Sequence, residues 1–292
     1  MGSFFYPFKA VVLDSVPGLC YNDRRKEGDP MEQKNVQAIC EAIQAAEREA
    51  AELILHAHGI LAENKTDHRN VVTEYDRRVQ ELLIRRLGEA VPGARFFCEE
   101  NDRHDDLQAE HLFIIDPIDG TMNFVHQLNH SCISVAYQSR GELLAAAIYN
   151  PYVDEMFSAV RGGGAYLNGR RLQVVTEPLS ETVVACGTAP YRDELRAQTF
   201  DWMERCFRVS LDIRRQGSAA LDLCSVAAGR AGLYFELSVC LWDYAAGALL
   251  VREAGGVCTQ TDGSPLPFDG SRPTILAGGS RAVADFQRLT EN

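Results

Sequence analysis

The sequence lacks the features that mark several large classes of protein. Its nine cysteines include no C-x-x-C pair, and an odd, unpatterned set is typical of reduced thiols in a cytosolic protein rather than of a disulfide framework. No apolar run approaches the roughly 18 residues that suggest a membrane span, and there is no internal repeat or low-complexity tract. We therefore expect a cytoplasmic globular protein without a membrane partner.

An excess of positive charge is also missing. The chain has 29 Lys and Arg against 41 Asp and Glu, which gives a net charge of −12. An acidic surface repels phosphate backbones, so nucleic acid is not an expected partner. Bound metal ions can still reverse the sign of the charge inside a single site.

Three catalytic or binding motifs are absent as well. RGGGAYLNG contains neither G-x-G-x-x-G nor G-K-[ST], so it indicates a tight hairpin rather than a nucleotide loop. His126 and His130 are four residues apart, but no H-E-x-x-H accompanies them. The acids of DPIDGT are three apart, whereas a covalent aspartyl-phosphate route would need D-x-D-G-T, with its two acids on one side of an extended chain.

The apolar pattern predicts alternating helices and strands on a chain long enough for a sizeable core. Helical spacing runs from Lys34, and VVTEYDRRVQELLIRRLG predicts a second helix, followed by short strands. Near residue 180 the pattern changes from successive strands to an alternation of strands and helices. We expect a poorly ordered extension over residues 1–32 rather than a signal peptide, an N-terminal α+β half over 33–180 and a C-terminal α/β half over 181–292.

Acidic residues stand where apolar runs end, and strand ends in layered α/β folds are where ligands bind. They are Glu99 and Glu100 after FFC, Asp116 and Asp119 after LFII, and Asp243 after CLW. If these acids converge, their repulsion requires cations, and oxygen ligands suit Mg²⁺ or Mn²⁺. The backbone amides of Gly120 and Thr121 would then bind a phosphate group.

Each acid also has an ordinary structural explanation. A single Asp at a strand end is usually a turn former or a cap, and Thr73 with Asp76 fits a capping box. Asp243 can likewise cap the helix that follows it. Coincidence across the whole set is much less frequent, so the set favours a metal site.

Four segments resemble the inositol monophosphatase family of metal-dependent, lithium-sensitive phosphatases. DPIDGTMNFVH and WDYAAGALLVREAGG are similar to its two signatures, and VVTEYD and CEEN lie upstream in the expected order. The resemblance covers roughly residues 34–290. It implies a five-layered αβαβα sandwich of the inositol monophosphatase and fructose-1,6-bisphosphatase type (α/β, or α+β), generally as a homodimer. Cys98 departs from the family pattern, which usually has a small residue before the acidic pair.

The resemblance also implies a role for each matching residue. Glu99, Asp116 and the carbonyl of Ile118 would bind one Mg²⁺, and Asp116, Asp119 and Asp243 a second. Thr121, oriented by Asp76, would help Glu99 to position the attacking water, and the amides of Gly120 and Thr121 would hold phosphate. Lys65 would lie on a mobile loop, with Glu100 behind the ligands. Substrate contacts would come from Asp119, Ala219, Glu236 and Asp243.

These observations predict a Mg²⁺-dependent phosphomonoesterase that hydrolyses myo-inositol monophosphate by metal activation of water. Two or three ions are expected, with Mn²⁺ as a substitute and Li⁺ as an inhibitor. Histidinol phosphate, or another sugar or nucleotide phosphate, remains an alternative substrate. A regulatory binding protein that keeps this fold is the alternative from a different class of function.

Overall fold

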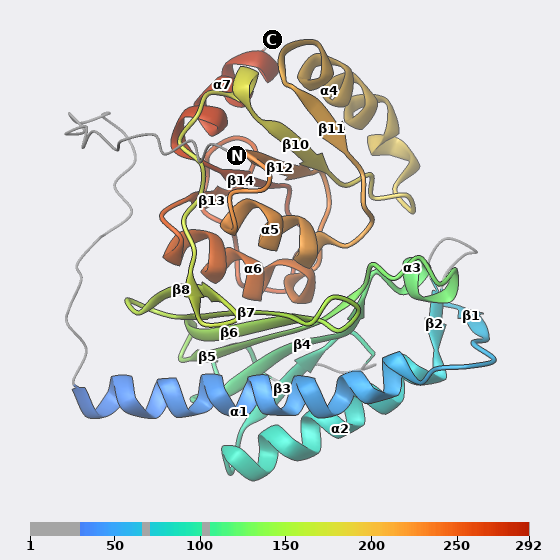
Figure 1. Cartoon of the computed structure of the whole chain (residues 1–292), viewed down its shortest axis with the longest axis vertical. Coiled ribbons are helices and arrows are strands. Elements are labelled where there is room, and N and C mark those ends of the chain that lie inside the picture. The colour runs from blue at the N-terminus through green and yellow to red at the C-terminus, as the bar shows by residue number, and fades with distance from the viewer. Residues whose placement is uncertain (1–29, 66–70, 101–105, 292) are drawn as a thin grey trace, which may run out of the picture.

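Five stacked layers make up the described part of the chain, residues 30–65, 71–100 and 106–291 of a computed structural model. Figure 1 shows helices below a first sheet, helices between that sheet and a second one, and helices above the second sheet. This arrangement confirms the predicted αβαβα sandwich. The predicted extension over residues 1–32 lies almost wholly outside the described residues.

The first layer consists of the helices α1 (Pro30–Leu55) and α2 (Glu74–Ala90). Buried apolar side chains recur on both helices at the three- and four-residue spacing that predicted them. On α1 they include Val36, Cys40, Ile43, Ala50 and Ile54, and on α2 they include Val79, Leu83 and Leu87. They form one core with the outer face of the first sheet.

The prediction that the second helix starts at Val71 was wrong by three residues. Val71–Thr73 is strand β2, which pairs antiparallel with β1 (Ala62–Asn64). Thr73 has an extended backbone, with φ −119° and ψ 167°, and its hydroxyl accepts hydrogen bonds from the amides of Tyr75 and Asp76. The helix therefore begins at Glu74, because the Val-Val-Thr run takes the extended conformation that β-branched residues favour.

The first sheet has seven strands in the order β3-β4-β5-β6-β7-β8-β9. Only β3 and β4 are parallel; every other neighbouring pair is antiparallel. Asn168 and Gly169 connect β8 to β9 with positive φ values of 48° and 79°, so the predicted tight hairpin is confirmed. The strands are β3 (Arg95–Cys98), β4 (Leu112–Asp119), β5 (Cys132–Ser139), β6 (Glu142–Asn150), β7 (Glu155–Val160), β8 (Gly164–Leu167) and β9 (Arg170–Arg171).

The middle layer consists of α5 (Ala219–Ala227) and α6 (Leu241–Glu253). Both helices are buried on nearly all sides, because one sheet covers them from below and the other from above (Figure 1). A helix that is apolar all round belongs in such a core. The hydroxyl of Ser218 caps α5 by accepting from the amide of Leu221, and Gly255, at φ 86°, follows the end of α6.

The second sheet has five strands in the order β11-β10-β12-β14-β13. Strand β10 pairs parallel with both β11 and β12, and the remaining pairs are antiparallel. The outer face of this second sheet packs on two helices through a core that includes Trp202, Phe235 and Phe286. The elements are β10 (Val183–Cys186), β11 (Asp212–Arg214), β12 (Leu233–Glu236), β13 (Val257–Thr259), β14 (Ile275–Gly278), α4 (Arg196–Val209), α7 (Ser280–Thr290) and the short 3-10 helices η1 (Leu179–Glu181) and η2 (Asp193–Leu195).

The predicted boundary near residue 180 falls on the connection between the two sheets. The helices α5 and α6 come from the second half of the chain, yet they share one core with side chains of the first sheet. The division into 33–180 and 181–292 therefore stays a prediction. The eight cysteines of the described residues, Cys98 among them, are all buried and unbridged.

Candidate active site

A cavity of about 180 Å³ lies where both sheets and the middle layer meet. Nine of the residues singled out from the sequence line it, and they come from the ends of β3, β4 and β12 and from the starts of α5 and α6 and of the short helix α3 (Thr121–Val125). These residues are Glu99, Asp116, Ile118, Asp119, Gly120, Thr121, Ala219, Glu236 and Asp243. Segments separated by more than 100 residues are thus brought to one place.

Strand β4 carries two of the acids, Asp116 and Asp119, where its pairing with β5 is irregular. It is buried along its whole length, and its register against β5 shifts between Asp116 and Asp119. The amide of Ile118 donates to Asp116 Oδ1 at 3.1 Å across this irregularity. Gly120, at φ 87°, then turns the chain, and a Cβ there would lie only 3.1 Å from the carbonyl oxygen of His130. Gly120 thus allows the backbone to form the cavity wall at this point.

Burial and mutual repulsion raise the pKa of the three aspartates. The pKa values of Asp116 and Asp243 lie well above the usual range, first because of burial and then because of the neighbouring acids. Burial also raises the pKa of Asp119, to about 6, although Ser218 Oγ and the amide of Ala220 donate to its Oδ2 at 2.5 and 2.7 Å. Such a group of buried acids is stabilised by cations.

The donor set of this cavity fits Mg²⁺ chemically, since it consists of carboxylates and one backbone carbonyl. Within the described residues, however, no three His, Cys, Asp or Glu side chains already form a metal cage. One oxygen of Asp243 accepts from the amide of Cys240 at 2.6 Å, and one oxygen of Glu99 accepts from Lys65. The predicted ligands therefore line one cavity, and two of them accept hydrogen bonds from other groups of the protein.

Lys65 lies between two acids at one side of the cavity. Its Nζ donates to Glu99 Oε1 at 2.8 Å and to Glu100 Oε1 at 2.5 Å. Burial alone would lower the Lys65 pKa, but the two carboxylates outweigh it and raise the pKa. Burial and Glu99 raise the pKa of Glu100 to about 7. The loop predicted to be mobile continues into residues 66–70, which lie outside the described residues.

Thr121 and Asp76 are in contact, as the predicted pairing requires. The Thr121 hydroxyl lies 3.3 Å from Asp76 Oδ1 and 3.0 Å from the carbonyl oxygen of Ile118, so it can donate to either. Asp76 Oδ2 accepts from the amide and the hydroxyl of Thr73, which confirms the predicted capping box. Asp76 is fully buried, and burial raises its pKa to about 6. The structural and the functional interpretation of Asp76 are therefore compatible.

Glu236, at the end of β12, lines the cavity and is held by two hydrogen bonds. Its Oε1 accepts from the amide of Ala189 at 2.8 Å, and its Oε2 accepts from the Tyr234 hydroxyl at 2.7 Å. A Cβ at Gly187 would be 1.8 Å from Glu236 Oε2, so only glycine at position 187 leaves room for this carboxylate. Burial raises the pKa of Glu236.

Some residues of this cavity have no counterpart in the prediction. Asp222, on α5, is 1% exposed and lines the cavity, and burial raises its pKa well above the usual range. Arg215 and Tyr191 line it from two loops. None of the three belongs to a recognisable motif. The apolar face of α5 was nevertheless readable, and it places Asp222 inside the core.

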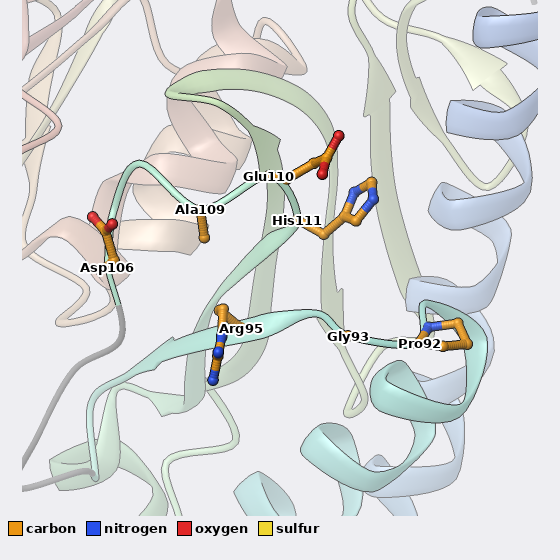
Figure 2. A pocket seen from close by; sticks show the side chains of 7 residues that line it. All are labelled: Pro92, Gly93, Arg95, Asp106, Ala109, Glu110 and His111. Carbon is orange, nitrogen blue, oxygen red and sulfur yellow. The ribbon is translucent and has the colours of Figure 1, made fainter.

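A second, wider hollow of about 760 Å³ lies at the outer edge of the first sheet. Figure 2 shows that Arg95 points away from Glu110 and His111 there, so the charged groups do not converge. His111 Nδ1 lies 2.7 Å from the Tyr137 hydroxyl, and Glu110 pairs with Arg140. This hollow has no group of side chains that suggests chemistry.

Comparison with known proteins agrees with the motifs. The sequence profile described as "Inositol monophosphatase family" matches residues 32–290. A protein of Rhizobium meliloti (strain 1021) named inositol-1-monophosphatase is 39% identical over 221 residues, or 75% of this chain and 82% of that protein. Nus factor SuhB of Salmonella typhimurium (strain LT2) is 39% identical over 215 residues, or 73% of this chain and 79% of that protein.

The solved structure of the extragenic suppressor protein suhB from Bartonella henselae superposes with a TM-score of 0.81 at 33% identity. The match covers 87% of this chain and 99% of that chain. The profile match, the sequence relatives and this structure agree with the motifs and with the fold. The chain belongs to the inositol monophosphatase family.

Proposed function

We propose that the protein is a Mg²⁺-dependent phosphomonoesterase whose substrate is myo-inositol monophosphate. The proposal rests chiefly on the four acids Glu99, Asp116, Asp119 and Asp243, which line one cavity together with the backbone of Gly120 and Thr121. An acidic cavity of this kind binds a phosphate ester only when cations offset its charge. Phosphate would then lie against the amides of Gly120 and Thr121.

The proposed metal ligands are those acids and the carbonyl of Ile118. Bound Mg²⁺, in two or three positions, would polarise the phosphoryl group and activate water, with Mn²⁺ as a substitute and Li⁺ as an inhibitor. Thr121, in contact with Asp76, would orient the water together with Glu99. Lys65 and Glu100 would support Glu99. Hydrogen bonds from fixed backbone donors to the phosphate would stabilise the charge that develops during transfer.

The proposed contacts with the alcohol part of the substrate are Asp119, Ala219, Glu236 and Asp243. Glu236 suits a neutral polyol because its carboxylate accepts hydrogen bonds from hydroxyl groups. It is held by Ala189 and Tyr234, so its position is fixed before a substrate arrives. These features support inositol phosphate rather than a simple aryl phosphate as the substrate.

Changing Glu236 to Gln is expected to weaken turnover of inositol phosphate selectively. The amide keeps the volume but presents an N–H₂ group where one carboxylate oxygen accepts now, so the hydrogen bonds with Ala189, Tyr234 or the polyol are lost in part. We expect kcat/KM for myo-inositol 1-phosphate to fall about ten- to a hundredfold, the scale of hydrogen bonds to a charged group. Turnover of p-nitrophenyl phosphate is the control, and equal losses for both esters would remove Glu236 from the polyol site.

Phosphate release from myo-inositol 1-phosphate and from histidinol phosphate, each with Mg²⁺ and then with EDTA, tests the function itself. We expect turnover of the inositol ester that EDTA abolishes. A preference for histidinol phosphate would keep the site and replace the substrate. No turnover of either ester would contradict the proposed enzyme and leave other sugar or nucleotide phosphates to be tried.

A regulatory role is the second candidate function, because close relatives carry the name Nus factor SuhB. If the chain acts through a partner, a variant without phosphatase activity should retain that role in cells.

We also propose that the protein is a homodimer, to be measured by light scattering, and that it is cytoplasmic, to be measured by cell fractionation. Within the described residues no helix is long and apolar enough to cross a membrane. The net charge of −12 still argues against direct binding of nucleic acid.

A further inference from the structure

The charged side chains that line the cavity are acids, with one exception. Six of the lining side chains are carboxylates, and Arg215 is the single Lys, Arg or His among the described residues that line it. The metal-site acids would be offset by bound cations. The charge felt by the alcohol part of a substrate is therefore set by Arg215 and by the two remaining acids, Asp222 and Glu236.

Arg215 is held at the rim of the cavity by two loops. Its Nε and Nη2 donate to the Thr188 hydroxyl at 3.3 and 3.2 Å. Its Nη1 lies over Gly217, where a Cβ would be 2.7 Å away. The guanidinium thus links the loop after β11 to the loop after β10. The Arg215 side chain stays accessible to a ligand bound in the cavity.

Arg215 and the two acids are close enough to interact. Burial raises the pKa of both Asp222 and Glu236, and the charge of Arg215 opposes that rise in each case. Removing the guanidinium would leave two acids facing the alcohol part of the substrate. A cationic group on the substrate would then meet a more favourable potential than it does while Arg215 is present.

We propose that Arg215 biases the substrate choice of the phosphatase proposed above, by disfavouring phosphate esters whose alcohol carries an amine. Neutral polyol phosphates are accepted because their hydroxyls donate to Glu236 and accept from the guanidinium. Amino-alcohol phosphates carry an ammonium group, which meets the positive charge of Arg215. The inference depends on the proposed function and adds a residue that discriminates between its two leading substrates.

The test compares kcat/KM for myo-inositol 1-phosphate and histidinol phosphate in the wild type and in Arg215→Gln, with p-nitrophenyl phosphate as a common reference. We expect the inositol-to-histidinol ratio to fall about tenfold in Arg215→Gln, the scale of one charge at short range in a partly solvated site. Arg215→Lys should keep most of the ratio, since it retains the charge. Arg214→Gln is the matched control, because Arg214 bonds Asp212 and the carbonyl of Ile213 and does not line the cavity.

An unchanged ratio in Arg215→Gln, or the same change in Arg214→Gln, would overturn the role of Arg215. Wild-type selectivity at high salt gives a second measurement that needs no variant, since screening should reduce the ratio. A ratio insensitive to both salt and Arg215→Gln leaves no electrostatic selection. If the wild type hydrolyses none of the three esters, the proposed phosphatase fails, and the inference fails with it.

Discussion

Asp116→Asn is expected to lower kcat/KM for myo-inositol 1-phosphate by about a thousandfold, the upper part of the range for losing one electrostatic stabiliser. Asp116 is 2% exposed at the centre of the acid group, and Glu99, Asp119 and Asp243 all raise its pKa after burial has done so. An amide cannot supply the negative charge that a shared metal ligand needs. Phosphate release at saturating Mg²⁺ is the measurement.

The Asp116→Asn protein should stay folded. Its Oδ1 can still accept from the amide of Ile118, and the substitution removes a charge from a crowded, buried group of acids. We therefore expect a thermal midpoint in EDTA at least as high as that of the wild type. Asp201→Asn, on the outer helix α4, is the control for the chemical change, since Asp201 pairs with Arg205 at the surface and lies outside the cavity lining. Near-normal turnover by Asp116→Asn would contradict the metal mechanism.

Glu47→Gln is expected to stabilise the protein in alkaline buffer. Glu47 is fully buried on α1, and neither of its carboxylate oxygens has a hydrogen-bond partner among the described residues. Burial raises its pKa well above the usual range, so the folded state holds a proton that the unfolded state releases. Stability then falls as pH rises above the unfolded-state value, by up to about 1.4 kcal/mol per pH unit, and Gln does not titrate.

Urea unfolding in EDTA at pH 5.5 and pH 8.0 measures this difference. We expect Glu47→Gln to gain about 1–3 kcal/mol over the wild type between the two pH values. Glu41→Gln is the matched control, because Glu41 is exposed on the same helix and accepts from Gln37. If the gain of Glu47→Gln does not change with pH, the carboxyl is not held in its protonated form.

Many of the helices and strands were predicted from apolar periodicity, whereas their layered arrangement was predicted from the family resemblance, and the exceptions have local causes. Val71–Thr73 fits the helical pattern as well as a strand, and its pairing with β1 is a contact between segments that periodicity does not detect. Glu47 shows the opposite case. It lies four residues after Ile43 and three before Ala50, on the buried stripe of α1. The position of Glu47 in the helical pattern indicates a buried residue, whereas its charge indicates an exposed one, so its burial was not predicted.

The residues of the site likewise fall into those that the sequence predicted and those that it did not. The acids around Asp116 were found because each follows an apolar run and belongs to a family motif, and the structure places them around one cavity. Arg215 and Asp222 were missed because their importance arises only when the loop after β11 and the helix α5 meet Glu236. A single sequence carries no local signal for such a meeting. Their roles follow from three-dimensional charge balance rather than from spacing.

The shared middle layer has a consequence during synthesis of the chain. The first sheet is complete at Arg171, but α6, which covers its inner face, begins only at Leu241. At about 5–20 residues per second, a ribosome needs roughly 4–14 s to make the intervening segment. Until α5 and then α6 are made, the nascent chain lacks the helices that cover this apolar sheet face. Chaperones that bind exposed apolar surface would have their main opportunity in this interval, and slowing translation between these points would lengthen it.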